Sequence, residues 1–385
     1  MKVIYLSNHV GQLDFDLIVK NASRKPNPAG QNFHGKLIAS LAKYFEVTCF
    51  SLVPSSEDCF EHKKGIKGNG IPHYYFYPPK RPIIPNALTI PPKIIRAVMD
   101  KFGKEKPGDL IIVYDTLNIS LSRAAKSLAR KLGCKRLAVC TDDPFNISGT
   151  SDTYISASLG LSKEADGYFC LTKGLEELYN VKQRPFLIHM GIVEETPEIK
   201  PYESEKPYVY YGGALFYKDG TDSLLEAYSS LKANFNLILA GHGPSEKKAK
   251  ELAEANGNII FLGQVSKEEN YSLEAGAELL INPRIYRAYL DKCSVPSKVM
   301  EYLHLGKHVA STLSTPIKDV YEESIDWIPS DPEKAKDQLI DFFVSHMDEN
   351  GNLINLKENT AQGRVLDAYG LEASGKLLYD FISSL

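Results

Sequence analysis

A lysine and a glutamate three residues apart, Lys298 and Glu301, form the sharpest chemical pattern in the chain. They follow Pro296 and Ser297, which predict the first turn of a helix that the serine would cap. A helix N-terminus offers free amides and a positive dipole end to a phosphate, and a bound anion would explain a lysine there. Glu301 lies on the same side of the helix and could accept hydrogen bonds from two ribose hydroxyls. The alternative is a surface Lys–Glu pair on a capped helix.

Two glycine-containing turns in the same half of the chain also suit a phosphate-bearing ligand. Gly212 and Gly213 follow an apolar run that predicts a strand, and Lys218 lies just beyond them. Gly241 and Gly243 occupy a second turn of this kind. Glycines let a backbone approach a ligand closely, and a nearby lysine would offset the charge of a diphosphate. The spacing is not that of the dinucleotide-binding fingerprint, so each turn by itself is a weak signal.

Acidic residues and a histidine in the first half are candidates for binding a hydroxyl-bearing partner. Asp142 and Asp143 follow a predicted strand and could orient a hydroxyl group, although Asp-Asp-Pro is equally a turn signal. His34 lies where a glycine-containing segment enters a predicted helix, so it either faces a phosphate or lies on the helix surface. Asp14 and Asp16 form an Asp-x-Asp pair in the predicted loop after the first strand, and we expect no metal there.

The overall composition excludes several functional classes. The 385 residues include 45 Lys and Arg against 48 Asp and Glu, a net charge of −3, which argues against a simple nucleic-acid binder. Six cysteines without a CxxC pair fit reduced thiols better than disulfides or a structural metal. No apolar stretch is long enough to cross a bilayer, and polar residues at 7–9 argue against a secretory signal. We therefore expect a cytoplasmic protein.

Short apolar runs alternate with helical patterns along the chain, which predicts parallel sheets covered by helices. In the first half, strands are expected at 2–7, 46–51, 73–77, 110–114, 136–141, 167–171 and 185–189, and helices at 33–44, 117–132 and 156–164. In the second half, strands are expected at 208–211, 236–240, 259–262, 278–282, 308–311 and 326–328, and helices at 223–231, 245–255, 267–273, 297–305 and 334–346.

A stretch rich in proline and charge at 191–206 separates the two series and predicts a domain boundary. We expect an α/β fold with two Rossmann-like, doubly wound domains, 1–192 and 193–365, facing each other across a ligand-binding cleft. The amphipathic end of the chain, 366–385, is expected to be a helix that packs near the N-terminal domain.

One segment, 62–106, is rich in lysine, arginine, proline and tyrosine. Such a composition can mark a surface that meets anionic lipid head groups or an acidic acceptor, which would place the protein at the inner face of the membrane. The alternative is a solvated loop that its prolines stiffen, beside an ordinary strand.

Together these motifs resemble the retaining glycosyltransferases of the GT-B fold, family 4 and its relatives, the group 1 glycosyltransferases. The segments 211–220 and 240–244 look like the family's glycine turns, and 296–309 closely resembles its Pro-Ser-Lys…Glu-Tyr…Gly-Lys segment. In the first half, 28–35 is similar to the family's glycine-rich turn before the first helix. The resemblance covers nearly the whole chain.

The resemblance implies a nucleotide-sugar donor held by the second domain and an acceptor approached through the first. Glu301 would bind the ribose, Lys298 and Lys218 the diphosphate, and Asp142 would complete the catalytic set. The implied donor-binding residues are Gly30, Gly213, Lys218, Gly241, Gly243, Ser294, Pro296, Ser297, Lys298 and Glu301. The implied acceptor-binding residues are Gln31, Asn32, His34, Asp142 and Asp143. No metal and no cofactor besides the nucleotide sugar are implied.

Two positions depart from the family pattern. An arginine common after the first glycine turn is replaced by Ala214, and Lys298 is a candidate to supply the missing charge. The first glutamate of the family's paired-Glu motif, which helps to hold the donor sugar, is replaced by Cys293. Asp291 is near enough in sequence to substitute for it.

The function that follows is a metal-independent, retaining hexosyltransferase that uses a UDP- or GDP-sugar. Its acceptor would be a glycan, or a lipid-linked precursor of a bacterial surface polysaccharide. A catalytically weakened accessory protein that binds a partner glycosyltransferase is the main alternative. Nucleotide-sugar epimerisation and glycan phosphorolysis on the same architecture are further alternatives.

Overall fold

The structure is a computed structural model that describes residues 1–21, 26, 28–54, 66–68, 70–78, 85–147, 150–329 and 331–385. It divides the chain into two compact units. The first unit is Met1–Ile192 together with Tyr369–Leu385, and the second is Val193–Ala368. Cys59 and, in the basic segment 62–106, residues 62–65, 69 and 79–84 lie outside the described residues.

The first unit is built on one sheet whose described strands run in the order β3-β4-β2-β1-β5-β6-β7-β8. All neighbouring strands are parallel except β3, which is antiparallel to β4. The strands are β1 (Lys2–Ser7), β2 (Glu46–Leu52), β3 (Ile66–Gly68), β4 (Ile71–Phe76), β5 (Leu110–Asp115), β6 (Lys135–Cys140), β7 (Gly167–Cys170) and β8 (Phe186–Ile188).

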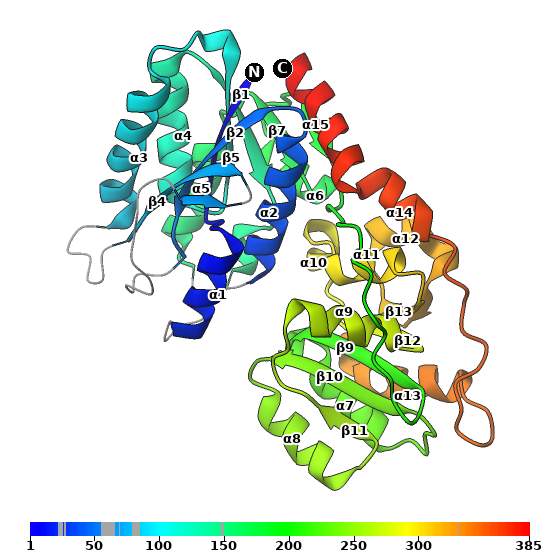
Figure 1. Cartoon of the computed structure of the whole chain (residues 1–385). Coiled ribbons are helices and arrows are strands. Elements are labelled where there is room, and N and C mark those ends of the chain that lie inside the picture. The colour runs from blue at the N-terminus through cyan, green and yellow to red at the C-terminus, as the bar shows by residue number, and fades with distance from the viewer. Residues whose placement is uncertain are drawn as a thin grey trace. The chain divides into compact units, whose positions relative to one another are not determined.

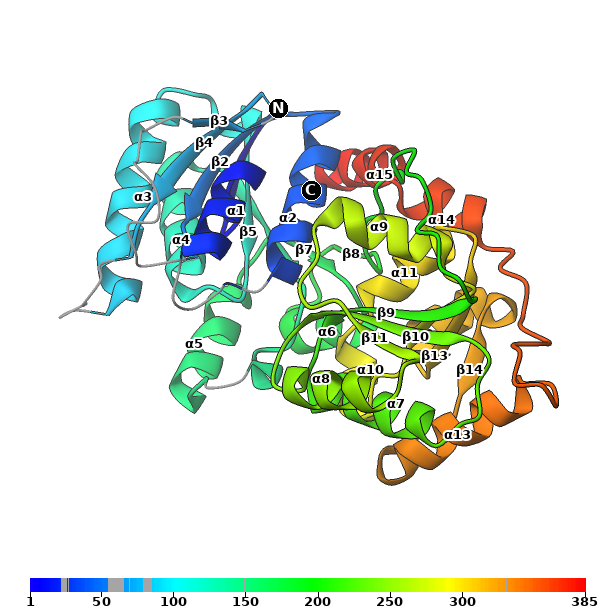
Figure 2. The same cartoon turned by 60° about the horizontal axis from the view of Figure 1, so that its bottom comes forward.

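Helices cover both faces of this sheet, as Figures 1 and 2 show. They are α1 (Gln12–Asn21), α2 (Pro28–Ala42), α3 (Asn86–Phe102), α4 (Ile119–Leu132), α5 (Asp152–Ser162), α6 (Lys173–Tyr179) and α15 (Leu371–Ser384). On one face, α2 and α15 pack with alternate side chains of the strands, among them Val3, Val113 and Val139. On the other face, α4 contacts α3, β5 and β6. Successive side chains of a strand point to opposite faces, and both faces are covered by helices. The apolar runs along the strands are therefore nearly continuous.

The C-terminal helix α15 lies alongside α2 (Figure 1). Its Leu378 and Ile382 are buried in the same cluster as Leu37 of α2. The two helices approach closely because Gly375 has no side chain: a Cβ there would lie 2.5 Å from the carbonyl oxygen of Ser40. The end of the chain is therefore part of the core of the first unit.

Part of the segment 62–106 forms a helix, so the prediction of a loop stiffened by proline is wrong for 86–102. Pro91 and Pro92 lie inside α3. Proline removes a helical N–H and would leave the carbonyl of the residue four positions earlier without its bond. The Arg123 guanidinium replaces that donor for Pro91, since its Nη1 donates to the Ala87 carbonyl at 3.0 Å. A partner from α4 thus stabilises a helix that the local sequence disfavours.

The second unit has a fully parallel sheet in which the described strands run in the order β11-β10-β9-β12-β13-β14. The strands are β9 (Tyr208–Ala214), β10 (Asn236–His242), β11 (Ile259–Phe261), β12 (Leu279–Asn282), β13 (His308–Thr312) and β14 (Asp326–Ile328). The helices are α7 (Thr221–Ser229), α8 (Glu246–Ala255), α9 (Lys267–Gly276), α10 (Ala288–Cys293), α11 (Ser297–His304), α12 (Thr315–Tyr321), α13 (Ala335–Ser345) and α14 (Gln362–Tyr369).

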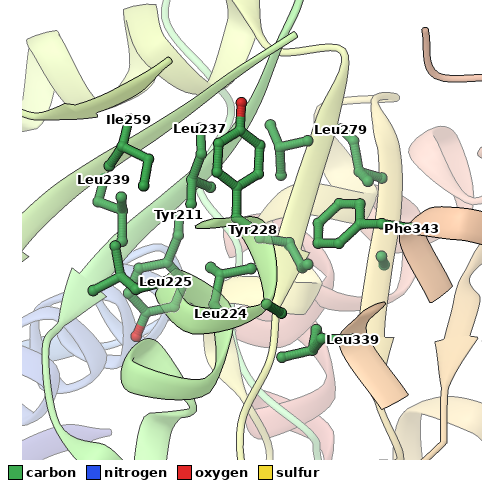
Figure 3. Packing of buried hydrophobic residues seen from close by; sticks show 14 of the residues in the cluster. Tyr211, Leu224, Leu225, Tyr228, Leu237, Leu239, Ile259, Leu279, Leu339 and Phe343 are labelled. Carbon is green, nitrogen blue, oxygen red and sulfur yellow. The ribbon is translucent and has the colours of Figure 1, made fainter. Parts of the chain in front are cut away.

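Figure 3 shows the packing on one face of this sheet. Leu224 and Tyr228 of α7 and Phe343 of α13 contact strand residues such as Leu237 and Leu279. The predicted α/β class with two Rossmann-like sheets is confirmed. None of the helices in the described ranges is both long and apolar enough to cross a membrane.

We predict that Gly375→Ala destabilises the first unit by roughly 1–3 kcal/mol, because the new methyl group would overpack against the Ser40 carbonyl. Alanine is otherwise the better helix former by about 1 kcal/mol. Gly160→Ala in α5 is the matched control, because a Cβ at Gly160 meets no atom within 4 Å. Urea unfolding should show opposite signs for the two variants, and equal effects would contradict the close contact between α15 and α2.

Candidate functional site

The second unit has its topological switch point between β9 and β12. The chain proceeds from β9 through β10 to β11 on one side of β9, and from β12 through β13 to β14 on the other. Loops at the carboxyl ends of two such strands diverge and leave a crevice that commonly binds a ligand. The residues that follow β9 and β12 therefore lie where a sheet of this topology commonly binds its ligand.

Lys298 lies over the end of β9. Its Nζ donates a hydrogen bond to the Tyr211 hydroxyl at 3.1 Å and lies 4.2 Å from the centre of the Tyr211 ring. A Cβ at Gly213 would lie 2.0 Å from this Nζ, so glycine is what lets the ammonium group reach the strand end. Within the described ranges no carboxylate forms an ion pair with Lys298. Its charge is therefore held at the switch point by an aromatic ring and a hydroxyl group.

The loops after β9 and β12 are joined through their backbones. The Ile285 amide donates to the Lys218 carbonyl at 3.1 Å. Gly220 has φ 77° and packs against the Pro283 carbonyl oxygen, which would lie 1.8 Å from a Cβ. Lys218 lies in a short 3-10 helix (Tyr217–Asp219) with an exposed side chain. Its ammonium is therefore available on the rim that these loops form.

The second glycine turn packs directly on the first. A Cβ at Gly241 would lie 1.7 Å from the Gly213 carbonyl oxygen, and one at Gly243 would lie 2.4 Å from the Leu215 carbonyl oxygen. The Leu215 amide also donates to the His242 carbonyl at 3.0 Å. Gly241 and Gly243 therefore hold the turn after β10 against the turn after β9.

Helix α11 brings the remaining predicted donor-binding residues to the same end of the sheet. Pro296 is its N-cap residue and Ser297 its first helical residue. No side chain caps the helix, so the prediction that Ser297 caps it is wrong. Ser294 accepts a hydrogen bond from Arg284 Nη1 at 3.2 Å. Glu301 is half-buried in the second turn of α11.

The first unit has its switch point between β1 and β5, and His34 lies behind it. The His34 side chain is buried, so the alternative that it lies on the helix surface is wrong. Its Nδ1 shares a hydrogen bond of 2.7 Å with the Tyr5 hydroxyl, and its Nε2 lies 3.7 Å from Asp115 Oδ2. Burial lowers the pKa of His34 to about 4 and raises the pKa of Asp115 to about 6.

The segment around Gly30 is helical rather than a turn before the first helix, because α1 precedes it and α2 begins at Pro28. Gly30 and Asn32 are exposed on α2. Gln31 is buried, and its amide binds both backbone groups of Val10: Nε2 donates to the carbonyl at 2.6 Å, and Oε1 accepts from the amide at 3.1 Å. Gln31 thereby fixes the loop after β1 to α2.

The carboxylates of Asp142 and Asp143 both bind their own turn. Asp143 is buried and its Oδ1 accepts from the Phe145 amide at 2.8 Å. Asp142 Oδ1 accepts from the Asp143 amide at 2.8 Å and from Asn146 Nδ2 at 3.3 Å. Asp142 is half-buried beyond the end of β6, where it keeps a partly accessible carboxylate.

Sequence reasoning missed three polar residues at the switch point of the first unit. Asn8 and His9 directly follow β1, and Asn118 follows β5. Asn118 Nδ2 donates to Asn8 Oδ1 at 3.2 Å, and His9 Nδ1 donates to the Gln31 carbonyl at 3.1 Å. Burial is the main reason that the pKa of His9 falls to about 3. Their places just after two neighbouring strands are the signal that could have found them.

The Asp-x-Asp pair is not in a loop as predicted, since both residues lie in α1. Asp14 Oδ2 accepts from the Tyr75 hydroxyl at 2.7 Å, and Asp16 accepts from Gln12 of the same helix. Over the described residues, no three histidine, cysteine or acidic side chains are grouped as a metal site would need.

Comparisons with known proteins identify a family for part of the chain and a fold for the whole. Residues 193–357 match the family model described as glycosyl transferases group 1. No curated protein matches the chain significantly in sequence. Sucrose-phosphate synthase from Thermosynechococcus elongatus superposes with a TM-score of 0.68 at 14% identity, over 100% of this chain and 99% of that one.

Two further solved structures show the same fold. Anabaena HepE in complex with UDP superposes with a TM-score of 0.65 at 12% identity, over 100% of both chains. The catalytic domain of starch synthase IV from Arabidopsis thaliana, bound to ADP and acarbose, gives a TM-score of 0.65 at 11% identity, over 100% of this chain and 99% of that one. The resemblance to the group 1 glycosyltransferases is therefore confirmed for residues 193–357, and the solved structures confirm the fold of the whole chain.

We predict that the imidazole of His34 stays neutral at pH 5, with a pKa near 4, in NMR of the protein with 15N-labelled histidine. The pKa of His34 in the folded state lies below its unfolded value of about 6.5. The free energy of unfolding therefore decreases as the pH falls from about 6.5, by roughly 2 kcal/mol at pH 5. The pKa of Asp115 is raised to about 6, so the contribution of Asp115 to the free energy of unfolding increases as the pH falls from about 6 to 4. Because burial is the cause, Tyr5→Phe should leave the pKa of His34 low. Titration near pH 6.5 would contradict a buried ring.

Proposed function

We propose, from the match of the second unit to the group 1 glycosyltransferases, that this protein transfers a sugar from a UDP- or GDP-sugar to a glycan acceptor with retention of configuration. The observation that carries the proposal is Lys298, whose ammonium group lies at the β9–β12 switch point without an acidic partner among the described residues. A cation held in that place suits the diphosphate of a nucleotide sugar. HepE, which has the same fold, has been crystallised with UDP-glucose.

The donor is assigned to the second unit. Lys298 and Lys218 would bind the diphosphate from α11 and from the loop after β9. The amides of Ser294 and Ser297, on either side of Pro296, would face its oxygens. Glu301 would accept hydrogen bonds from the ribose hydroxyls. Gly213, Gly241 and Gly243 would let the backbone approach the nucleotide closely.

The chemical step would depend on stabilising the leaving group. As the bond between the anomeric carbon and the phosphate oxygen breaks, negative charge grows on the diphosphate, next to the ammonium groups of Lys298 and Lys218. The same diphosphate oxygen would accept the proton of the incoming acceptor hydroxyl on the face from which it leaves, which retains the configuration. No bound metal is required, because the two lysines supply the positive charge.

The acceptor is assigned to the first unit. Asp142 keeps a partly accessible carboxylate that would orient an acceptor hydroxyl, together with Asn32 on the exposed surface of α2. The buried Gln31 and Asp143 would act by holding the backbone of this region, since their side chains bind backbone groups of Val10 and Phe145. The buried His34 would act through its hydrogen bond with the Tyr5 hydroxyl. Contact of 62–106 with a membrane that carries a lipid-linked acceptor remains a prediction.

The accessory-protein alternative rests on two residues. Cys293 and Ala214 stand where the family has a glutamate and an arginine, and Cys293 is buried. A protein that only binds a partner glycosyltransferase would have no need to bind a nucleotide. Nucleotide binding therefore distinguishes the two functions.

We expect Glu301→Ala to weaken binding of the cognate nucleotide by roughly 1–3 kcal/mol, because two hydrogen bonds from ribose to a carboxylate are lost. Saturation-transfer NMR against UDP, GDP and their sugars, with EDTA present, is the measurement. Glu254→Ala on the exposed side of α8 is the control and should bind normally. Unchanged affinity in Glu301→Ala would refute the ribose role, and no binding of any nucleotide by the wild type would favour the accessory protein.

We expect Lys298→Ala to lower the rate of nucleoside diphosphate release from the donor by on the order of 10²-fold, with the folded state retained. The reason is that the variant lacks the ammonium group that would stabilise negative charge on the leaving diphosphate. The surface variant Lys247→Ala should keep its rate, because exposed ion pairs contribute little. A Lys298→Ala protein that unfolds more easily but keeps normal specific activity would mean that Lys298 serves only to pack on Tyr211.

A further inference from the structure

A second group of cationic side chains lines a pocket of the second unit beside the candidate donor site. The pocket lies at the carboxyl ends of β12 and β13 and is closed on one side by α10. Its polar lining is Asn282, Arg284, Tyr286, Arg287, Asp291, Ser294, Thr312 and Ser314. The function proposed above assigns no role to the two arginines.

The guanidinium groups of Arg284 and Arg287 have no acidic partner among the described residues. Arg284 Nη1 donates to the Ser294 hydroxyl at 3.2 Å, and its carbonyl accepts from Thr312 Oγ1 at 2.6 Å, so both ends of the residue are held. The Arg287 side chain is exposed at the pocket. Across the described part of the chain, no carboxylate lies within ion-pair distance of either guanidinium.

The acid that lines the pocket, Asp291, already binds another helix. Its Oδ1 accepts from the Thr315 amide at 2.8 Å, and its Oδ2 accepts from the Thr315 hydroxyl at 2.5 Å. Asp291 therefore caps α12 from α10. Its charge offsets one arginine, and the three ionised side chains leave the pocket with one net positive charge.

Ser314 is the second, independent sign of a ligand. It occupies the N-cap position of α12, but its hydroxyl makes no capping bond because Asp291 binds that end of the helix. The residue is 3% exposed, and its Oγ has no hydrogen-bond partner among the described residues, although it lines the pocket. Buried hydroxyl groups are normally hydrogen-bonded, so this one is suited to donate to a bound acceptor.

The position of the pocket identifies the part of the donor that would reach it. Ile285, in the pocket wall, donates its amide to the carbonyl of Lys218, which we assign to the diphosphate. Pro296, at the start of α11, also lines the pocket. The transferred sugar is attached just beyond the diphosphate. It is therefore the part of the donor that would lie nearest to the pocket. Cys293, directly before Ser294, is buried and brings a thiol in place of a carboxylate.

We infer that this pocket binds the carboxylate of the donor sugar, so that the transferred residue is a uronic acid. The inference rests on the proposed function. A carboxylate matches the planar donor pattern of a guanidinium through paired hydrogen bonds, and the Ser314 hydroxyl would donate a third. A phosphate of the donor itself has the same chemistry and is the other source of an anion.

The test compares affinities of the full chain for UDP, UDP-glucose and UDP-glucuronic acid by calorimetry, with the GDP series of GDP, GDP-mannose and GDP-mannuronic acid alongside. The wild type should bind the uronic acid donor roughly tenfold more tightly than the neutral one. Arg284→Gln and Arg287→Gln should each reduce this preference and leave the affinity for the free nucleotide unchanged. Lys292→Gln is the matched control, because Lys292 is an exposed cation on α10 that does not line the pocket.

The other outcomes show whether the anion that the arginines bind is the sugar carboxylate or a phosphate of the donor. Equal losses for the free nucleotide, the neutral donor and the uronic donor in Arg284→Gln would mean that the arginines bind the diphosphate, and would overturn the inference. A wild type that binds UDP or GDP without preference for a uronic acid would overturn the inference alone. A wild type that binds no nucleotide would overturn the proposed function and this inference together, so binding of free UDP or GDP by the wild type distinguishes the two failures.

Discussion

The close approach of the loops after β9 and β12 is the constraint on which the rest of the second unit depends. Gly220 packs on the Pro283 carbonyl at a distance that no side chain would permit, and the backbone bond between Ile285 and Lys218 joins the two loops. Because these strands lie at the switch point, their loops would otherwise diverge. The contact fixes where Lys218 and the start of α11 lie, and hence where positive charge gathers.

The cations around the start of α11 form two groups with different surroundings. Lys298 reaches towards β9, where a tyrosine ring and a glycine leave it room. Arg284 and Arg287 lie in the pocket towards β13, whose wall includes hydroxyl groups, and Arg284 donates to the one of Ser294. An ammonium on an aromatic face and a guanidinium among hydroxyls suit anions of different shape. This is why we assign the first group to a diphosphate and the second to a carboxylate.

Three predicted site residues of the first unit, Gln31, His34 and Asp143, are buried and bind other groups of this unit. Gln31 binds the loop after β1, Asp143 binds its own turn, and His34 is kept neutral by burial between Tyr5 and Asp115. Through these hydrogen bonds the buried side chains fix the loops at the end of the sheet. Exposed groups nearby, among them Asn32, would then be the ones left to meet the proposed acceptor.

The sequence by itself determined the two βα series and the segments that carry the glycine turns and the Lys298–Glu301 pair, because apolar periodicity and turn residues are local signals. Only the tertiary structure decided that 86–102 is helical, since the compensating donor for its prolines, Arg123, comes from another helix. It also decided that Ser297 caps nothing and that His34 is buried. The arginine pocket could not be predicted, because Asp291 and Ser314 acquire their roles only where α10 meets α12. A residue's remaining hydrogen-bonding capacity depends on partners that are distant in sequence.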